Sequence, residues 1–478
     1  MLNALASWLE QERQWPQWAS VPCLLLLCVL LLLHVVDRLL QPKTNKLQSS
    51  SQAEANTSVG DAAFQRFQRQ YLLVYFLVMF ADWLQGTHMY SLYQICATWQ
   101  TMTHNWYICW QQSYGVNVSA LFLTGFLSSA VFGNFIGLVV DRYGRRNACL
   151  VYCALEIVIN LLENVPDMTV LLVGRVLGGV STSLLFSAFE SWMVTEHRAR
   201  GFAEELLPKT FAIASEGNGV LAVLAGFAAQ AAADVFGEIG PFRVAVVVTT
   251  LAAVCVGFWP ENFGSPDAAK SLSQLSKDEA KSKAGTRLST EAIALGLCYS
   301  LFDGAMYVFV FLWYPTLEAV VPSGILPSGL VFSSFMLCIA IGGKLFDQIS
   351  SRVREELLAC LLCCVSLVAL VVPTVTGSFK WILGAFFVFE LAIGAFTPCC
   401  GTLRSRYFPA EGLGTTLGIF RLPTNLLVVL GTGGANHVTS NELFRGCSAV
   451  LFVSMLCGVK LLLSSAQKKT GRHSNKSD

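Results

Sequence analysis

The feature that most constrains this chain is a series of thirteen apolar stretches, each long enough to cross a lipid bilayer. A spanning helix needs roughly 17 to 25 mostly apolar residues, because only a helix satisfies its own backbone groups in hydrocarbon. The stretches lie near residues 18–36, 71–91, 117–140, 147–165, 168–194, 210–235, 240–259, 290–314, 328–349, 356–376, 380–401, 413–433 and 443–463. A composition of 54% hydrophobic and 13% charged residues agrees. We therefore expect an all-α protein whose surface faces lipid.

The order of the stretches predicts two bundles of six helices after one extra N-terminal helix. The polar segment between the bundles contains KDEAKSK and several serines, a composition typical of a flexible linker. The predicted parts are an extra transmembrane helix with a cytoplasmic linker (1–66), a first bundle (67–260), a central linker (261–289), a second bundle (290–463) and a tail (464–478).

Basic residues orient the spans, because cytoplasmic loops of membrane proteins carry the excess of lysine and arginine. The chain has 32 basic residues, of which Arg175 and Arg421 lie within spans. With the 37–70 segment, the central linker and the C-terminus inside, nearly all of the others are cytoplasmic. The exceptions are Arg13, Arg243, Lys380 and Arg445. The leading stretch could instead be a secretory signal, but it is long, follows acidic residues and lacks a clear cleavage site. We expect a retained span with the N-terminus outside, in the cell membrane.

Several function classes find no support in the sequence. The net charge is only +1, so the chain has no overall basic excess that would indicate a nucleic-acid partner. The sequence shows no phosphate-binding loop, nucleophile elbow or HExxH pattern, so we expect no enzyme, cofactor or metal. Most of the 16 cysteines lie in apolar runs. Cys96 and Cys109 share one polar loop, and whether they form a disulfide depends on a separation that the sequence does not give.

A motif between the third and fourth spans, GLVVDRYGRR at 137–146, matches the loop signature of the major facilitator superfamily. Gly137 would permit close helix approach, and Asp141 would need a cationic partner at the C-terminal end of its helix. We expect an arginine of the motif to supply it, at a gate on the cytoplasmic side. The motif residues are Gly137, Asp141, Arg142, Gly144, Arg145 and Arg146.

The equivalent loop of the second half, GKLFDQISSR at 343–352, is a worn copy of this motif. It keeps Gly343, Asp347 and Arg352 but lacks the inner glycine. Two related halves with a substrate site at their interface, near the membrane midplane, are the expected design of a secondary transporter.

More specific strings resemble one family within this superfamily. They are ADWLQ at 81–85, VGRVLGG at 173–179, LLFSAFESW at 184–192, FVFLWYP at 309–315 and VFSSFM at 331–336. Together they resemble the eukaryotic molybdate-anion transporters, over residues 67–462. The resemblance implies uptake of molybdate, a tetrahedral dianion, by alternating access across the bilayer.

Two other functions stay open. One is transport of another small anion, such as sulfate or an organic acid, and the other is a transport-dead nutrient receptor. A receptor usually needs a large cytoplasmic effector segment, whereas the linker and tail here are short. The sequence makes no prediction for the oligomeric state.

Ionisable groups within spans are costly and are therefore functional candidates. Arg421 and Arg175 carry a permanent charge on a planar fork that matches an oxyanion, so we expect them to bind substrate, with help from Gln85 and Asn425. The alternative is that each arginine pairs with a carboxylate such as Glu190, Glu216 or Glu390. No acid lies one turn from Arg421 on its own span, which favours it over Arg175.

Buried carboxylates are the candidates for carrying a proton with the anion, because burial disfavours their charged form. Asp82 and Asp303 hold similar positions near the middle of the first spans of the two halves. Glu216 and Glu390 are further candidates of this kind. A structural acid paired with an arginine is the alternative.

Overall fold

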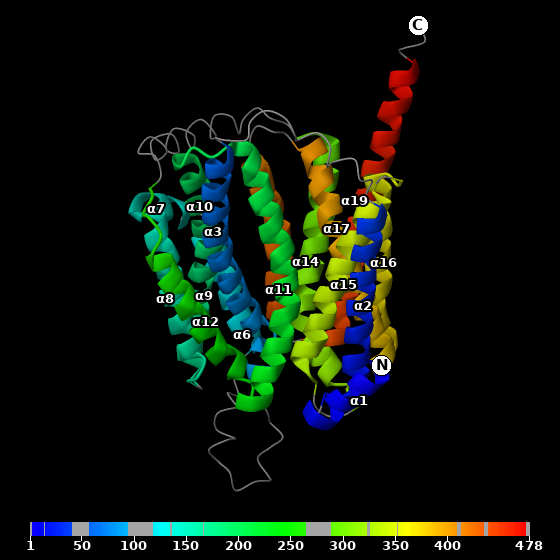
Figure 1. Cartoon of the computed structure of the whole chain (residues 1–478). Coiled ribbons are helices and arrows are strands. Elements are labelled where there is room, and N and C mark those ends of the chain that lie inside the picture. Colours follow the sequence, from blue (N-terminus) through cyan, green and yellow to red (C-terminus); the bar gives the residue numbers. More distant parts are fainter. Residues whose placement is uncertain are drawn as a thin grey trace. The chain divides into compact units, whose positions relative to one another are not determined.

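The computed structural model describes most of the chain, and all regular structure in the described parts is helical (Figure 1). The described residues are 2–13, 15–40, 57–93, 118–133, 136–165, 167–263, 288–322, 326–350, 352–408, 413–434 and 438–474. Cys96 and Cys109, whose pairing the sequence leaves open, lie outside these residues, as does most of the predicted central linker.

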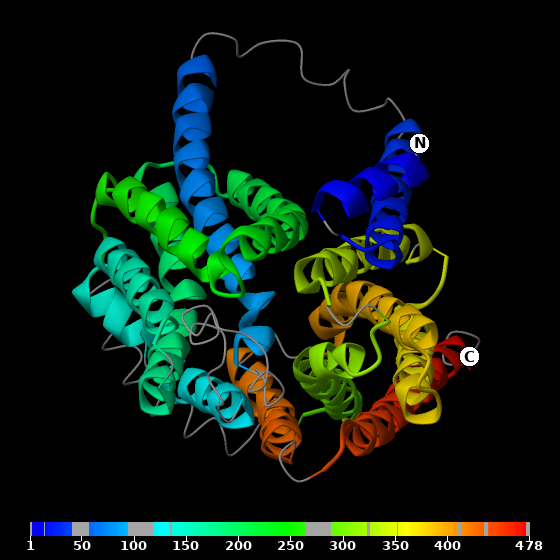
Figure 2. The same ribbon diagram turned by 90° about the horizontal axis from the view of Figure 1, so that it is seen from below.

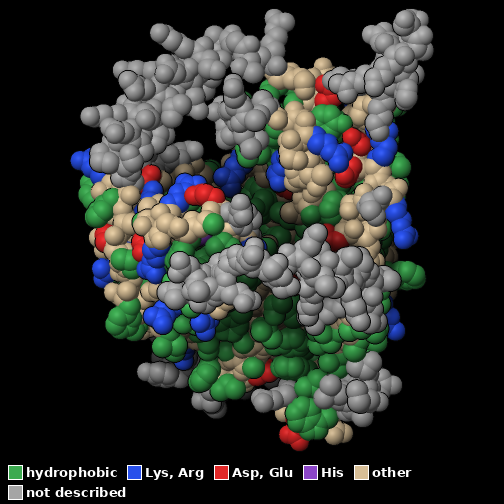
Figure 3. Space-filling view, turned by 45° about the horizontal axis from the view of Figure 1, so that its top comes forward, with side chains coloured by type: hydrophobic (Ala, Val, Ile, Leu, Met, Phe, Trp, Pro, Cys, Tyr) green, Lys and Arg blue, Asp and Glu red, His purple; other side chains and the backbone are tan. Residues whose placement is uncertain are grey.

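Long apolar helices dominate, as the sequence predicts. Nine described helices are long and apolar enough to cross a membrane, and α6 (Val118–Phe132) is apolar but shorter. Large apolar side chains stay exposed, including Phe258 at 79% and Val375 at 74%. In the space-filling view, hydrophobic side chains gather over the lower part of the visible face (Figure 3). Such exposure is expected for a chain whose solvent is lipid.

The first of two compact units, here the N-terminal unit, comprises residues 31–281 and 328–333. Its helices are α3 (Thr57–Gly86), α4 (Met89–Tyr93), α6, α7 (Ile136–Tyr143), α8 (Arg145–Leu162), α9 (Met168–Leu185), α10 (Ala188–Ala199), α11 (Leu207–Phe236) and α12 (Gly240–Gly257). Helix α3 packs on α11 and α12, α8 packs on α9 and α12, and α6 packs on α9. In the core, the ring of Trp192 stacks on that of Trp259 with centroids 3.7 Å apart.

Two predicted spans of this unit are interrupted. The stretch at 117–140 contains α6 and α7 as separate helices. The stretch at 168–194 lies in one candidate span, Met168–Ala199, with a turn at residues 186–187 between α9 and α10. Hydropathy sees only a continuous apolar run, so it does not detect such breaks. Ser187 Oγ donates hydrogen bonds to the carbonyls of Ser183 and Leu184 at the second break.

The other unit, here the C-terminal unit, comprises residues 1–30, 282–327 and 334–478. Its helices are α1 (Leu2–Arg13), the first part of α2 (Gln17–Leu40), α14 (Thr290–Glu318), most of α15 (Ser328–Ile349), α16 (Glu355–Val375), α17 (Phe379–Tyr407), α18 (Leu413–Gly434) and α19 (Ser440–Ser474). Helix α14 contacts α17, α18 and α19, and α16 contacts α17 and α19. Gly342 and Gly394 lie where α15 and α17 approach most closely, since a Cβ at either would collide with backbone of the facing helix.

The leading apolar stretch forms α2, which lies beside α15 (Figures 1 and 2). Its buried face carries the small residues Ala19, Ser20 and Cys23. Trp18 makes an edge contact with Phe379 of α17, with ring centroids 4.6 Å apart. The extra helix is therefore an integral part of the C-terminal unit.

Candidate functional site

The first-half motif forms the junction between α7 and α8. Arg145 donates two hydrogen bonds to Asp141 Oδ1, at 3.0 Å from Nε and 2.7 Å from Nη2. Its remaining Nη1 donates to Thr195 Oγ1 on α10. The cationic partner expected for Asp141 is thus Arg145, one turn further along, and the pair is tied to a third helix.

Glu261, which the sequence did not single out, completes this junction. Its carboxylate accepts hydrogen bonds from the backbone N–H groups of Arg146 and Asn147 at 2.9 and 3.1 Å, which satisfies the N-terminus of α8. Gly144 has a φ of 99°, and a Cβ there would lie 2.7 Å from the Glu261 carboxylate. The inner glycine of the motif is therefore required by its backbone conformation and by this carboxylate.

Other expectations for the two motifs are met only in part. A Cβ at Gly137 would meet no described atom within 4 Å, so the expected close approach is not seen there. In the second half the close approach is at Gly342 and not at Gly343, where a Cβ would make only an ordinary contact. Asp347 makes no ion pair within the described part of the chain, so the Asp141–Arg145 pair of the first half has no described counterpart at Asp347.

Arg175 on α9 is held in a buried polar cluster of the N-terminal unit. Its Nη2 lies 2.6 Å from Glu163 Oε1, which also accepts a hydrogen bond from Tyr93 at 2.5 Å. The guanidinium lies 5.6 Å from the Tyr93 ring centroid and contacts Met89 Sδ at 2.9 Å. The two side chains of the pair are 13% and 2% exposed. Of the two roles that the sequence leaves open for Arg175, this geometry favours the structural one.

Gln85 belongs to a second polar cluster of the same unit. Its Nε2 donates to Glu156 Oε2 at 2.9 Å, and Ser181 donates to the other oxygen of that carboxylate at 2.5 Å. Asp82 on α3 is half-buried, and the negative charge of Glu156 acts on its carboxyl group. The side-chain amide of Gln85 is therefore already hydrogen-bonded to a carboxylate. Asp82 makes no ion pair with a described residue.

Arg421 and Asn425 lie one turn apart on α18, and both side chains are exposed. Arg421 makes no ion pair with any residue that the structure describes, so none of the three carboxylates considered for it is its partner. Of the two roles that the sequence leaves open for Arg421, pairing with one of these carboxylates finds no support among the described residues, and the substrate role stays a prediction. Glu216 on α11 is exposed, whereas Glu390 on α17 is 4% exposed and its Oε2 has no described hydrogen-bond partner.

Asp303 on α14 is half-buried, and the cations that act on it are Arg404 and Arg421. Arg404, which the sequence places among the cytoplasmic loop cations, is in α17, and its guanidinium lies 5.1 Å from the ring centroid of Tyr299. Tyr299 is one turn before Asp303 on α14. The structure thus brings two predicted site residues, Asp303 and Arg421, to one side of the C-terminal unit and adds Arg404 to them.

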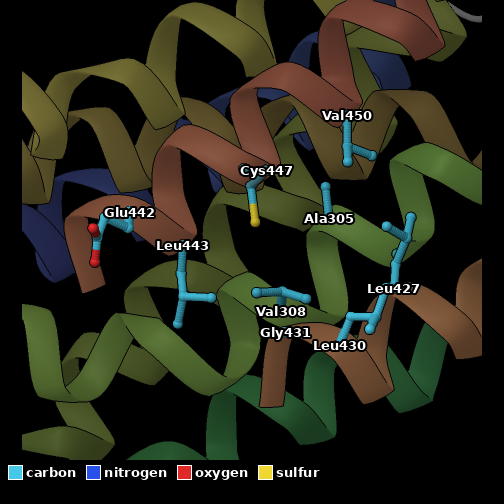
Figure 4. A pocket seen from close by; sticks show the side chains of 11 residues that line it. Ala305, Val308, Leu427, Leu430, Gly431, Glu442, Leu443, Cys447 and Val450 are labelled. Carbon is cyan, nitrogen blue, oxygen red and sulfur yellow. The ribbon is translucent and has the colours of Figure 1, made fainter. Parts of the chain in front are cut away.

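A pocket of about 190 Å³ in the C-terminal unit has the wrong chemistry for an anion. It lies among α14, α18 and α19, where Val308, Leu443 and Cys447 point toward it (Figure 4). Its lining is almost wholly apolar, with Glu442 at one end. An oxyanion there would lose its hydration without gaining hydrogen-bond donors.

Comparison with known proteins gives one family. Residues 43–385 match a model of the major facilitator superfamily that is described as sugar transporters with 12 transmembrane segments. A molybdate-anion transporter of Xenopus tropicalis is 32% identical over 430 residues, which are 86% of this chain and 89% of that protein. The molybdate-anion transporter of Danio rerio is 32% identical over 447 residues, covering 85% and 89%.

Solved structures of the same fold are more distant in sequence. A peptide transporter in complex with sulfate has a TM-score of 0.63 at 15% identity, covering 84% of this chain and 94% of that one. The nucleoside transporter NupG has a TM-score of 0.60 at 10% identity, covering 83% and 99%. A D-xylose–proton symporter has a TM-score of 0.57 at 14% identity, covering 84% and 97%. At these identities the likeness concerns the fold.

Proposed function

Because the chain belongs to the molybdate-anion transporter family of the major facilitator superfamily, we propose that it is a secondary transporter that takes molybdate into the cell by alternating access. The observation that carries this proposal is the match to molybdate-anion transporters over 86% of the chain at 32% identity. The transporter fold supports it, since that fold moves small solutes through the membrane without an enzymatic step.

The chemistry of Arg421 suits the substrate. Molybdate is a tetrahedral dianion, and a guanidinium can donate two parallel hydrogen bonds to two of its oxygens. Arg421 is exposed and without an ion pair among the described residues, so its donors are available. Asn425, one turn further along the same helix, would add a neutral donor. Arg175 and Gln85 remain secondary members of the proposed site, because each is already bonded to a carboxylate.

Asp141 and Arg145 would hold the inner gate. Their ion pair joins α7 to α8, and the bond from Arg145 to Thr195 extends it to α10. A pair that can break and re-form while three helices shift is a suitable latch for alternating access. This role is separate from anion binding, because Asp141 would repel the substrate.

The proposed location is the cell membrane, with the N-terminus outside and the C-terminus in the cytoplasm. The support is the distribution of basic residues among the loops. A C-terminal tag that an impermeant reagent labels in intact cells would reverse this orientation.

Uptake into cells that lack endogenous molybdate transport tests the function. We expect the wild-type chain to raise cellular molybdenum, measured by mass spectrometry, and excess sulfate to reduce that uptake little. Arg421→Lys should weaken uptake, because it keeps the charge but loses the planar fork, and Arg421→Ala should abolish it. Removal of a charged hydrogen bond costs about 1.5 to 3 kcal/mol, or roughly ten- to a hundredfold in affinity.

The alternatives predict different results in the same cells. Strong competition by sulfate together with sulfate uptake would identify another small anion as the substrate. Binding of molybdate without any uptake would favour a receptor. Wild-type uptake by Arg421→Ala would show that Arg421 is not the ligand, and surface labelling would confirm that each variant reaches the membrane.

A further inference from the structure

Arg404 differs from the other arginine near the end of the same helix. Arg406 donates to Glu355 at 2.9 Å and 2.7 Å, which neutralises it at the surface. Arg404 is half-buried and makes no ion pair with any described residue. Its guanidinium instead lies over the Tyr299 ring, 5.1 Å from the centroid. A half-buried cation with a ring as its neighbour still has hydrogen-bond donors to offer.

Helix α18 brings Arg421 to the same stretch of α14. The side chain of Thr424 donates to the carbonyl of Ser300 at 2.9 Å, which fixes the register of the two helices. The ring of Phe420 lies 6.2 Å from that of Tyr299. The charge of Arg421, the residue after Phe420, acts on Tyr299 and Asp303 of α14. Helices α17 and α18 therefore each bring one guanidinium near this segment of α14.

Asp303 lies one turn beyond Tyr299 on α14. The positive charges of both arginines act on its carboxyl group, and the effect of Arg404 is the larger. Two guanidinium groups and one carboxylate leave an excess of one positive charge. Arg421 is exposed, but Arg404 is half-buried, and a cation partly removed from water is unfavourable unless something compensates its charge. An anionic ligand with several acceptor oxygens provides such compensation.

We propose that Arg404 is a second anion ligand, which together with Arg421 forms a two-arginine site for a tetrahedral dianion, with Asp303 as the internal counter-ion of the empty site. The inference rests on the proposed function for the identity of the dianion, but its geometry requires only a tetrahedral oxyanion. A bound dianion offers acceptors to guanidinium groups from two helices. The competing role for Arg404 is structural, as a cation that merely stacks on Tyr299.

Binding to the purified full-length chain in lipid nanodiscs tests the site. Molybdate, tungstate, sulfate and phosphate are titrated separately, and binding is measured by calorimetry. Arg404→Ala should weaken binding of the oxyanion that the wild type binds most tightly by roughly ten- to a hundredfold, and Arg404→Lys should weaken it less. Arg406→Ala is the matched control on the same helix and should leave the affinity unchanged.

The unfolding temperature of each variant is measured separately, so that loss of an anion ligand can be distinguished from misfolding. Tyr299→Phe keeps the ring that supports the guanidinium, so this variant should bind the oxyanion like the wild type. If Arg404→Ala unfolds at a lower temperature but binds with wild-type affinity, Arg404 has only the structural role and the inference is wrong. If Arg404→Ala is misfolded, Arg404→Lys decides instead, because a ligand loses affinity in this variant and a mere stacking cation does not.

The outcomes separate this inference from the proposed function. A wild-type chain that binds sulfate and not molybdate overturns the proposed substrate, and loss of sulfate binding in Arg404→Ala would still support the two-arginine site. A chain that binds molybdate equally well with and without Arg404 overturns the inference alone. A wild-type chain that binds none of the four oxyanions overturns both.

Discussion

Removing either partner of the Arg175–Glu163 pair should destabilise the N-terminal unit, whereas removing both should cost little more than removing one. The pair is joined at 2.6 Å, and both side chains are largely buried. Arg175→Met leaves the Glu163 carboxylate with Tyr93 as its hydrogen-bond donor, and Glu163→Gln leaves an uncompensated guanidinium. Breaking one side of a buried ion pair costs about 3 to 5 kcal/mol.

The double variant gives the magnitude of the interaction. If each single substitution costs about 3 kcal/mol, independent sites would cost about 6 kcal/mol together. Because the double variant buries no uncompensated charge, its free energy of unfolding should be lower than that of the wild type by only about 3 kcal/mol. The measurement is the free energy of unfolding in mixed micelles for the wild type, both single variants and the double variant. Arg243→Met, which alters an exposed arginine of the same unit, is the control and should change stability by less than about 0.5 kcal/mol.

The same variants decide the role of Arg175. A folded double variant that still binds oxyanion shows that Arg175 is structural. Single substitutions that cost less than about 1 kcal/mol would refute the buried-pair argument. A stable double variant without oxyanion binding would instead make Arg175 a ligand.

Two further predictions concern gating and coupling. Asp141→Asn should slow molybdate transport while leaving molybdate binding largely intact, because the change weakens the ion pair with Arg145 and alters no group that contacts the anion. Normal transport, or loss of molybdate binding, would assign Asp141 another role. We propose Asp303 as the acid that carries a proton with the anion. Asp303→Asn should then retain oxyanion binding, because both arginines remain, but its uptake should not respond to an inward proton gradient that stimulates the wild type. A variant stimulated like the wild type would exclude Asp303 as the coupling acid, and wild-type uptake that ignores the gradient would exclude proton coupling.

Much of the fold is predictable because the bilayer imposes it. A span must be long, apolar and helical, so hydropathy alone finds most long helices of both units and the extra helix α2, although it misses the breaks between α6 and α7 and between α9 and α10. A cationic partner for Asp141 is also predictable, because the arginines of the motif closely follow it at the C-terminal end of its helix, but the sequence does not say that the partner is Arg145. The motif explains why these residue types occur there.

The parts that the sequence did not predict depend on contacts between distant segments. Glu163 lies 12 residues before Arg175, and no spacing along the sequence indicates that it is the partner of that arginine. Glu261 reaches back to the start of α8 from beyond α12. The sequence indicates a loop position for Arg404, because the apolar stretch ends near residue 401, but α17 continues to Tyr407. A longer helix brings a cation from the end of the span to Tyr299, and no pattern along the sequence reports that contact.

The most direct test of the account is molybdate influx into proteoliposomes that contain only the purified chain. The account predicts saturable influx that is absent from protein-free liposomes, persists in excess sulfate and is lost in Arg421→Ala but not in Arg406→Ala. Influx of sulfate without influx of molybdate, or equal molybdate influx with and without Arg421, would contradict it.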